Sequence, residues 1–322
     1  MAILLGGALL LWGCQPQIEP VSKDLQQITM AISPTPYSGL VAIADEMGYF
    51  RKEGLDARMV LFPSGYDALE SLLLGEADLA TVADIAVSAA IYDTSQIRVL
   101  ASIGTNLGSQ IVARKDRGIR APSDLRGKTI GFSANTTSDY FLYAFLLTEG
   151  ISRADVTVVN VPPDRQVEAL LNGEVDAVSA FAVYAYEAKK ALGDAAVSWD
   201  SQNNLVFHWL LTTRADRLGK PAGLEKTLRA LLRAESFAHA QPDAAQRIIA
   251  RKWGYDPAFM RVSWPRNRLD VSLSQSIVAS LRFYSNWYVE KHGQPYGAVD
   301  VLDYIHIDVL EKVDPTLVTV FR

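Results

Sequence analysis

The stretch from Ser64 to Ala80 contains a pattern that occurs twice in the chain, and it constrains the fold more than any other feature. Each copy predicts a short helix, a glycine that ends the helix in the left-handed conformation, and the start of a buried strand. We expect the leucines to face a core and the acidic pair to solvate the turn. Two copies in register predict two α/β lobes of similar plan. The shared residues are Glu70, Leu72, Leu73, Gly75, Glu76 and Asp78, which recur as Glu168, Leu170, Leu171, Gly173, Glu174 and Asp176.

Length and composition agree with two folded lobes and exclude several classes of function. The chain has 322 residues, of which 49% are hydrophobic, so it has enough apolar material for two cores. Its formal net charge is −5, and no basic stripe of the kind that binds nucleic acid is present. The one cysteine, Cys14, lies in a leading segment, so we expect neither a disulfide within the chain nor a catalytic thiol.

The four histidines are scattered singly along the sequence. None has a partner at the spacing that is typical of metal ligands, so the sequence predicts no metal site and no cofactor. We expect each histidine to be a surface or half-buried residue. The four are His208, His239, His292 and His306.

The first residues are typical of an exported protein. Ile3 to Trp12 is apolar but shorter than the roughly 20 residues that span a bilayer, which favours a signal peptide. Leu11-Trp12-Gly13-Cys14 resembles a bacterial lipobox, in which the cysteine is lipidated. The alternative is a plain signal peptide. We therefore expect a leader over residues 1–14, with Cys14 lipidated, and a polar tether over 15–27.

Strands and helices alternate through the first 200 residues. Strands are expected at 28–32, 57–62, 79–82 and 97–103, and again at 128–132, 156–161 and 177–179, with helices between them. This order predicts an α/β fold in which each lobe has a mostly parallel sheet flanked by helices. We place lobe 1 at 28–113 plus 206–322 and lobe 2 at 114–205. After a strand at 205–212 the pattern is helical, and this tail is expected to pack mainly on the first lobe.

The order of these parts resembles a known family. The carrying motifs are the lipobox-like leader, Ala44-Asp45-Glu46-Met47-Gly48-Tyr49-Phe50, the doubled Leu-Leu-x-Gly-Glu-x-Asp, and Asp124-Leu125-Arg126-Gly127-Lys128-Thr129-Ile130-Gly131. Together they are similar to the solute-binding lipoproteins of bacterial ABC importers that bind nitrate, sulfonates, taurine and thiamine-pyrimidine precursors. The resemblance implies a two-lobe fold of the periplasmic-binding-protein type II, a small ligand in the cleft, an inner-membrane permease as partner, a lipid anchor on the extracytoplasmic side, and a monomer that is not an enzyme.

Candidate ligand-binding residues follow from strand direction. Ligands of open α/β sheets bind outside the carboxyl ends of the strands, and in two lobes these ends face each other across the cleft. The loops at those ends carry hydroxyl, amide and aromatic side chains. The candidates are Thr35, Tyr37, Ser38, Ser64, Gly65, Tyr66, Asp84, Ser133, Asn135, Thr136, Thr137, Phe181 and His208. Trp209 lies beside His208 and is expected at the back of the cleft.

Helix starts that carry hydroxyls can hold an anion without any Arg or Lys, because free N–H groups and a partial positive charge lie there. The alternative is ordinary N-capping, which Ser, Thr and Asn provide in any protein. Asp84 is either a cap or a ligand for a cationic nitrogen. The aromatic side chains either stack on a planar ligand or belong to the core.

Three functions remain open from the sequence. The leading one is capture of a small anionic or zwitterionic solute of the sulfonate, taurine or nitrate class by hinge closure. The thiamine-precursor branch of the family carries Asn and His in its first loop. This chain has Pro36-Tyr37-Ser38-Gly39 there, so its first loop does not match that branch and is closer to the sulfonate and nitrate branch. The second is a cytosolic enzyme of pyrimidine or menaquinone biosynthesis, for which Asp84 and His208 form the one acid–base pair that can be constructed. The third is a sensor subunit for a membrane kinase.

Overall fold

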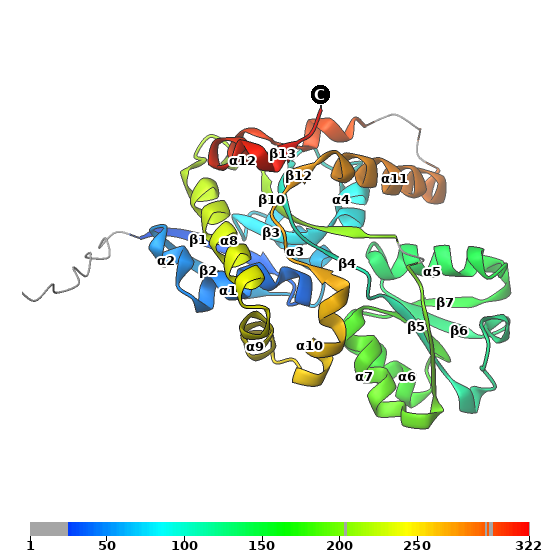
Figure 1. Cartoon of the computed structure of the whole chain (residues 1–322). Coiled ribbons are helices and arrows are strands. Elements are labelled where there is room, and N and C mark those ends of the chain that lie inside the picture. The colour runs from blue at the N-terminus through cyan, green and yellow to red at the C-terminus, as the bar shows by residue number, and fades with distance from the viewer. Residues whose placement is uncertain (1–24, 203–204, 294, 296–298, 322) are drawn as a thin grey trace, which may run out of the picture.

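The computed structural model describes residues 25–202, 205–293, 295 and 299–321. Within these residues two α/β lobes are each built around one sheet, and Figure 1 shows the two sheets side by side with helices around them. The predicted signal peptide with Cys14, and most of the predicted tether, lie outside the described residues. No helix that the structure describes is both long and apolar enough to cross a membrane.

The sheet of the first lobe has six strands. Its order is β11-β4-β10-β3-β1-β2. The strands are β1 (Gln26–Ile32), β2 (Leu55–Leu61), β3 (Leu79–Ala83), β4 (Ile97–Asn106), β10 (Phe207–Arg214) and β11 (Asn267–Arg268).

The sheet of the second lobe has five strands in the order β7-β6-β8-β5-β9. They are β5 (Gln110–Arg114), β6 (Thr129–Phe132), β7 (Thr157–Asn160), β8 (Ala177–Ala180) and β9 (Ala196–Asp200). A separate pair, β12 (Leu273–Ser274) and β13 (Val318–Thr319), lies near the C-terminus.

Both sheets are mixed, where the sequence predicted mostly parallel ones. The βαβ part of each lobe is parallel, because β1 pairs with β2 and β3 and β6 pairs with β7 and β8. The strands by which the chain crosses between lobes run antiparallel to their neighbours, as in β10 against β3 and β5 against β8. A crossing strand enters its sheet from the cleft side, which is where the parallel strands end.

The first crossing lies earlier than the boundary drawn from the sequence. Residues 110–113 were assigned to lobe 1, but β5 pairs along its length with β8 and β9 of the second sheet. The chain therefore passes from lobe 1 to lobe 2 between Asn106 and Gln110, and it returns between β9 and β10.

Helices follow the strands as expected. In the first lobe they are α1 (Gly39–Glu46), α2 (Tyr49–Lys52), α3 (Gly65–Leu73) and α4 (Asp84–Ala90). In the second they are α5 (Thr137–Thr148), α6 (Gln166–Asn172) and α7 (Ala182–Leu192). Both copies of the repeat end their helix at a glycine in the left-handed region, Gly75 (φ 81°) and Gly173 (φ 75°), as the sequence predicted.

The helical C-terminal region packs mainly on the first lobe, in agreement with the prediction. Its helices are α8 (Ala222–Ala240), α9 (Pro242–Trp253), α10 (Pro257–Ser263), α11 (Gln275–His292) and α12 (Asp308–Val313). Helices α8 and α9 cover α1, and α11 packs on α4. Figure 1 shows that α11 also reaches toward α5 and that α10 lies beside α7, so this region borders the second lobe on two sides.

Burial explains why the strands hold their register. In β5, Ile111 and Ala113 belong to one cluster of the second lobe and Val112 to the cluster on the opposite face, so both faces of the sheet are covered. The first lobe has one large core. Tyr140 and Phe141 of α5 join that core from the second lobe. The Tyr140 ring meets Tyr284 edge-on, with 4.9 Å between ring centroids, so the two lobes share an apolar contact.

Candidate functional site

A small cavity lies between the lobes, at the ends of the parallel strands. Its volume is about 20 Å³, which is room for about one water molecule. The predicted site residues that line it are Thr35, Tyr37, Gly65, Tyr66, Thr136, Thr137 and Phe181. Ser33, Ala83, Ala86 and Trp209 complete the wall. Residues from both lobes therefore meet at one point, as the direction of the strands predicted.

The starts of four helices from both lobes face this cavity. Gly65 is the first residue of α3 and Ala83 the N-cap of α4, while Thr136 caps α5 and Phe181 is the N-cap of α7. Because the first N–H groups of a helix have no partner inside the helix, each start carries donors and a partial positive charge. Phe181 has no side chain that can cap α7. The wall contains no Asp, Glu, Lys, Arg or His among the residues that the structure describes.

Gly65 is needed because the chain passes very close to the wall at this point. A Cβ atom on Gly65 would lie 2.6 Å from Cη2 of Trp209 and 3.0 Å from Cα of Val82. Both distances are too short for a side chain, so only glycine lets α3 begin against the aromatic wall.

Ser64 and Ser38 do not line the cavity, and Ser64 caps α3 through its side chain. Ser64 Oγ accepts a hydrogen bond from the N–H of Asp67 and donates one to the Asp67 carboxylate. Ser38 Oγ donates toward the carbonyl oxygens of Ser33 and Thr35. Ser64 is therefore an ordinary N-cap, whereas the Ser38 side chain makes no capping hydrogen bond to α1.

In the loop after β6, some polar residues hold the loop in place and others line the cavity. Ser133 Oγ donates to the carbonyl of Val161 and holds the loop on the second lobe. Asn135 has a left-handed backbone (φ 59°), which Asn tolerates better than most residues. Its side chain interacts with the hydroxyl of Tyr66 across the cleft. Thr136 and Thr137, directly after it, face the cavity.

Aromatic side chains form the first-lobe wall. The Tyr37 ring lies 4.8 Å from the Trp209 ring and 5.2 Å from the Phe207 ring, between centroids, and meets both edge-on. Burial raises the pKa of Tyr37 well above its ordinary value, so its hydroxyl keeps its proton and remains a donor. The indole Nε1 of Trp209 is buried and has no hydrogen-bond partner among the described residues.

His208 and Asp84 lie outside the cavity wall. Successive residues of a strand point to opposite faces, so in β10 Trp209 reaches the cavity and His208 does not. The His208 ring lies near hydroxyls instead, with Nδ1 3.4 Å from Ser102 Oγ and Nε2 3.3 Å from Ser276 Oγ. Burial lowers the pKa of His208 to about 4, so its ring is neutral at pH 7.

Asp84 is fully buried at the start of α4. Its carboxylate accepts hydrogen bonds from the backbone N–H of Ile85 and of His208, each at 2.9 Å, and from the hydroxyl of Ser280. Desolvation nevertheless raises its pKa to about 7. It bonds the backbone of His208 and not the ring, so the acid–base pair that an enzyme would need is not assembled at the cavity.

Polar contacts close the cleft on both flanks. On one side Lys291 of α11 pairs with Asp139 of α5 at 2.6 Å. On the other, Asp256 accepts hydrogen bonds from Lys190 at 2.8 Å and from the Tyr186 hydroxyl at 3.1 Å. Asp139 is the acidic residue of the first turn of α5, and Lys291 offsets its charge beside the cavity.

Comparison with known proteins gives consistent matches. The family described as NMT1/THI5 like matches residues 35–245. The taurine-binding periplasmic protein of Escherichia coli K12 is 27% identical over 225 residues, which cover 69% of this chain and 67% of that protein.

Solved structures share the fold over most of the chain. The alkanesulfonate-binding protein SsuA from Xanthomonas axonopodis pv. citri, bound to MOPS, matches with a TM-score of 0.76 at 18% identity and covers 89% of this chain and 100% of its own. The desulfurization enzyme DSZB matches with a TM-score of 0.65 at 17% identity, covering 90% of this chain and 99% of its own. These likenesses establish the two-lobe fold of periplasmic binding proteins.

Proposed function

The chain belongs to the NMT1/THI5-like family, and on that premise we propose that it is the solute-binding component of an ABC importer. It captures a small anionic or zwitterionic solute of the sulfonate, taurine or nitrate class between its lobes and presents it to a membrane permease. The named binding proteins among its relatives support a binding protein, not an enzyme. The lipobox-like sequence at Cys14 supports a lipid anchor on the extracytoplasmic side.

The observation that carries the proposal is the meeting of four helix starts from two lobes at a wall without charged side chains. Helix N-termini and hydroxyls stabilise an anion through N–H and O–H donors. A wall of this kind offers a cation or a metal ion no carboxylate. The hydroxyl of Thr137 and the phenol of Tyr37 add donors, and the aromatic rings suit the organic part of the solute.

The size of the cavity implies movement. A cavity of about 20 Å³ does not hold a sulfonate. The lobes must therefore part to admit one, and with the solute bound they must stay farther apart than in this structure. The chain crosses between the lobes from β4 to β5 and from β9 to β10, and we place the hinge at the described residues of these two crossings. Ligand contacts to α3 on one lobe and to α5 and α7 on the other would favour the closed state.

The described cavity wall does not offer the groups that a catalytic site would need. DSZB has the same fold, but in this chain Asp84 and His208 do not line the cavity, and none of the described wall residues is a nucleophilic cysteine or a carboxylate. We therefore put forward one function.

Calorimetry tests the proposal. The purified chain is titrated with taurine, short alkanesulfonates and nitrate, and with the matched sulfonamide of each sulfonate, which keeps the size but removes the negative charge. We expect saturable binding of at least one of these solutes with a stoichiometry of one and no binding of the matched sulfonamide. Equal binding of both, or binding of cationic solutes alone, would contradict an anion site. Mass spectrometry of Cys14 after expression in a bacterium that processes lipoproteins tests the anchor.

A further inference from the structure

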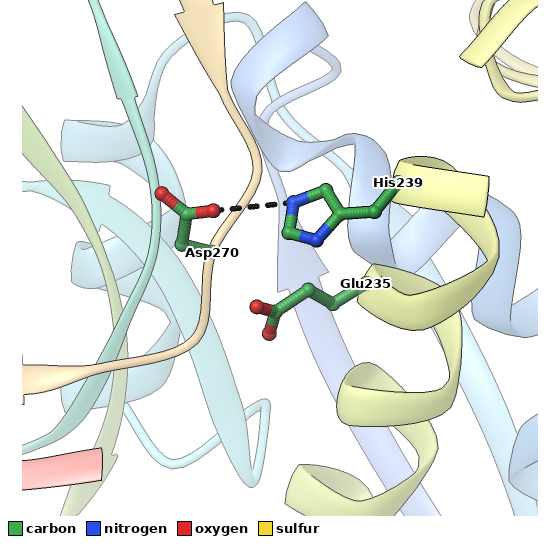
Figure 2. A group of neighbouring side chains, drawn as sticks. All are labelled: Glu235, His239 and Asp270. Carbon is green, nitrogen blue, oxygen red and sulfur yellow. Dashed lines mark ion pairs between the residues drawn. The ribbon is translucent and has the colours of Figure 1, made fainter. Parts of the chain in front are cut away.

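Three side chains with metal-binding atoms converge on the surface of the first lobe, and none of them belongs to the cavity wall. Glu235 and His239 are four residues apart on α8, so they lie on the same face of the helix one turn apart. Asp270 follows β11 and faces them, as Figure 2 shows. One ligand atom from each residue lies within 4.8 Å of the other two.

We propose that Glu235, His239 and Asp270 bind one divalent transition-metal ion of the Zn²⁺ type. His239 supplies Nε2, each carboxylate supplies one oxygen, and water completes the coordination. This site is independent of the solute cavity, and its ligand is a metal ion and not a transported anion.

The spacing of the ligand atoms suits a metal. His239 Nε2 and Asp270 Oδ1 are 3.3 Å apart. Two ligands bound at 2.0–2.1 Å to a tetrahedral centre lie about 3.3 Å from each other, so this pair needs no rearrangement. One oxygen of the Glu235 carboxylate lies within 4.8 Å of both of these atoms.

Each carboxylate has an outer partner that leaves an oxygen for the metal. Glu235 Oε2 accepts a hydrogen bond from the N–H of Val271 at 2.9 Å, and Asp270 Oδ2 accepts one from Arg268 Nε at 2.9 Å. Such bonds to the far oxygen orient metal-binding carboxylates in proteins. The neighbours of Asp270 in the chain, Leu269 and Val271, are buried at 4% and 1% exposure, so the position of Asp270 is fixed by the core.

The ligand set selects the class of metal. Imidazole nitrogen favours Zn²⁺, Co²⁺ and Ni²⁺, whereas Mg²⁺ and Ca²⁺ take oxygen ligands and gain little from a histidine. The stability order rises from Mn²⁺ through Co²⁺ and Ni²⁺ to Cu²⁺ and falls again at Zn²⁺, so geometry and the availability of the metal decide among these ions. The site is open to solvent because the His239 side chain is 58% exposed, so the ion has a path in.

A bound ion would join α8 to the segment between β11 and β12. That segment lies along β4, through the pairing of Ser102 with Ser272 and of β11 with β4. The metal would therefore tie a C-terminal helix to the first sheet and raise the stability of the folded lobe, since an ion that binds only the folded chain adds to the free energy of unfolding.

Titration of metal-free protein with ZnCl₂ tests the proposal. Cys14→Ser is used as the background in the full chain, because it removes the one thiol that would also bind zinc. We expect one zinc ion per chain, a higher melting temperature with zinc than with EDTA, and much weaker or no binding of Mg²⁺ and Ca²⁺.

The variants are His239→Ala, Asp270→Asn and the isosteric Glu235→Gln, with His292→Ala as the matched control on α11. Loss of a direct ligand is expected to weaken zinc binding by more than the roughly tenfold to hundredfold that loss of an outer partner costs, while the control keeps full affinity. A cooperative melting transition in EDTA shows that a variant is folded. If another variant fails to fold, the zinc affinity of Glu235→Gln decides the proposal. No saturable zinc binding, or equal affinity in all variants, would mean a plain His–Asp ion pair and overturn the proposal.

Discussion

Asp176 makes in the second lobe the same hydrogen bonds that Asp78 makes in the first. The Asp78 carboxylate accepts the N–H of Thr29 at 2.7 Å, and the Asp176 carboxylate accepts the N–H of Thr129 at 3.0 Å. In both lobes the aspartate N–H returns a hydrogen bond of 2.8 Å to the carbonyl of the same threonine. The acidic position of the repeat thus holds the start of β3 and of β8 against the neighbouring strand, whereas from its sequence it was expected to solvate a turn.

Asp176→Ala should destabilise the chain. The substitution leaves the N–H of Thr129 without its acceptor in a partly buried position, and loss of a charged partner costs about 1–3 kcal/mol. Urea unfolding measures the change in the free energy of unfolding. Glu174→Gln, two residues away and exposed, is the control and should stay within about 0.5 kcal/mol of the wild type. Equal stability of both variants would show that the clamp is not a stabilising contact.

Asp84 should make stability depend on pH. Its pKa is about 7 in the folded chain and ordinarily 3.8, so the folded state holds the proton more tightly than the unfolded state. The stabilising contribution is therefore complete below about pH 4 and is lost as the pH rises through 7. We expect the stability of the wild type relative to Asp84→Asn to fall by on the order of 2–4 kcal/mol over this range. Urea unfolding at several pH values measures it, and parallel curves for the two proteins would refute it.

His208 should act in the opposite direction over the same range. Its pKa is about 4 when folded and ordinarily 6.5, so the unfolded chain takes up this proton first as the pH falls. The wild type should lose on the order of 1–3 kcal/mol relative to His208→Gln between pH 7 and pH 4. Urea unfolding at several pH values measures this loss. The double variant His208→Gln with Asp84→Asn should show neither the pH dependence due to His208 nor that due to Asp84. A His208→Gln curve with the wild-type slope would mean that the ring is solvated.

The sequence predicted the fold class, the two lobes and the loops that meet at the cavity. It could do so because local signals carry that information: the repeat, the glycine that ends each helix, and the hydroxyl-rich starts of α3 and α5. It could not decide which side chains of those loops face inward. Ser64 is a helix cap while Gly65 beside it lines the wall, and Trp209 faces the cavity while His208 does not. Neighbouring residues in a strand point to opposite faces, so a shift of one residue decides which side chain reaches the cavity. Tertiary packing sets that register.

The candidate metal ligands are a second feature that could not be predicted from the sequence. Glu235 and His239 have the spacing of neighbours on a helix, but two residues do not define a metal site. Asp270 joins them because Leu269 and Val271 are buried in the core of the first lobe. A local pattern in the sequence could not point to Asp270 as a neighbour of His239, because a contact between distant segments leaves no such pattern.

Gly65→Ala should impair both stability and ligand binding. The added methyl would lie 2.6 Å from Trp209 Cη2 and 3.0 Å from backbone of β3, so either the indole moves into the cavity or α3 shifts away from it. Overpacking of this kind costs about 1–3 kcal/mol. Gly219→Ala is the matched control, because its Cβ would meet nothing within 4 Å. Thermal unfolding and calorimetry with the best anionic ligand measure the two effects. If Gly65→Ala retains wild-type stability and wild-type affinity, the close approach of Gly65 to Trp209 does not shape the binding site.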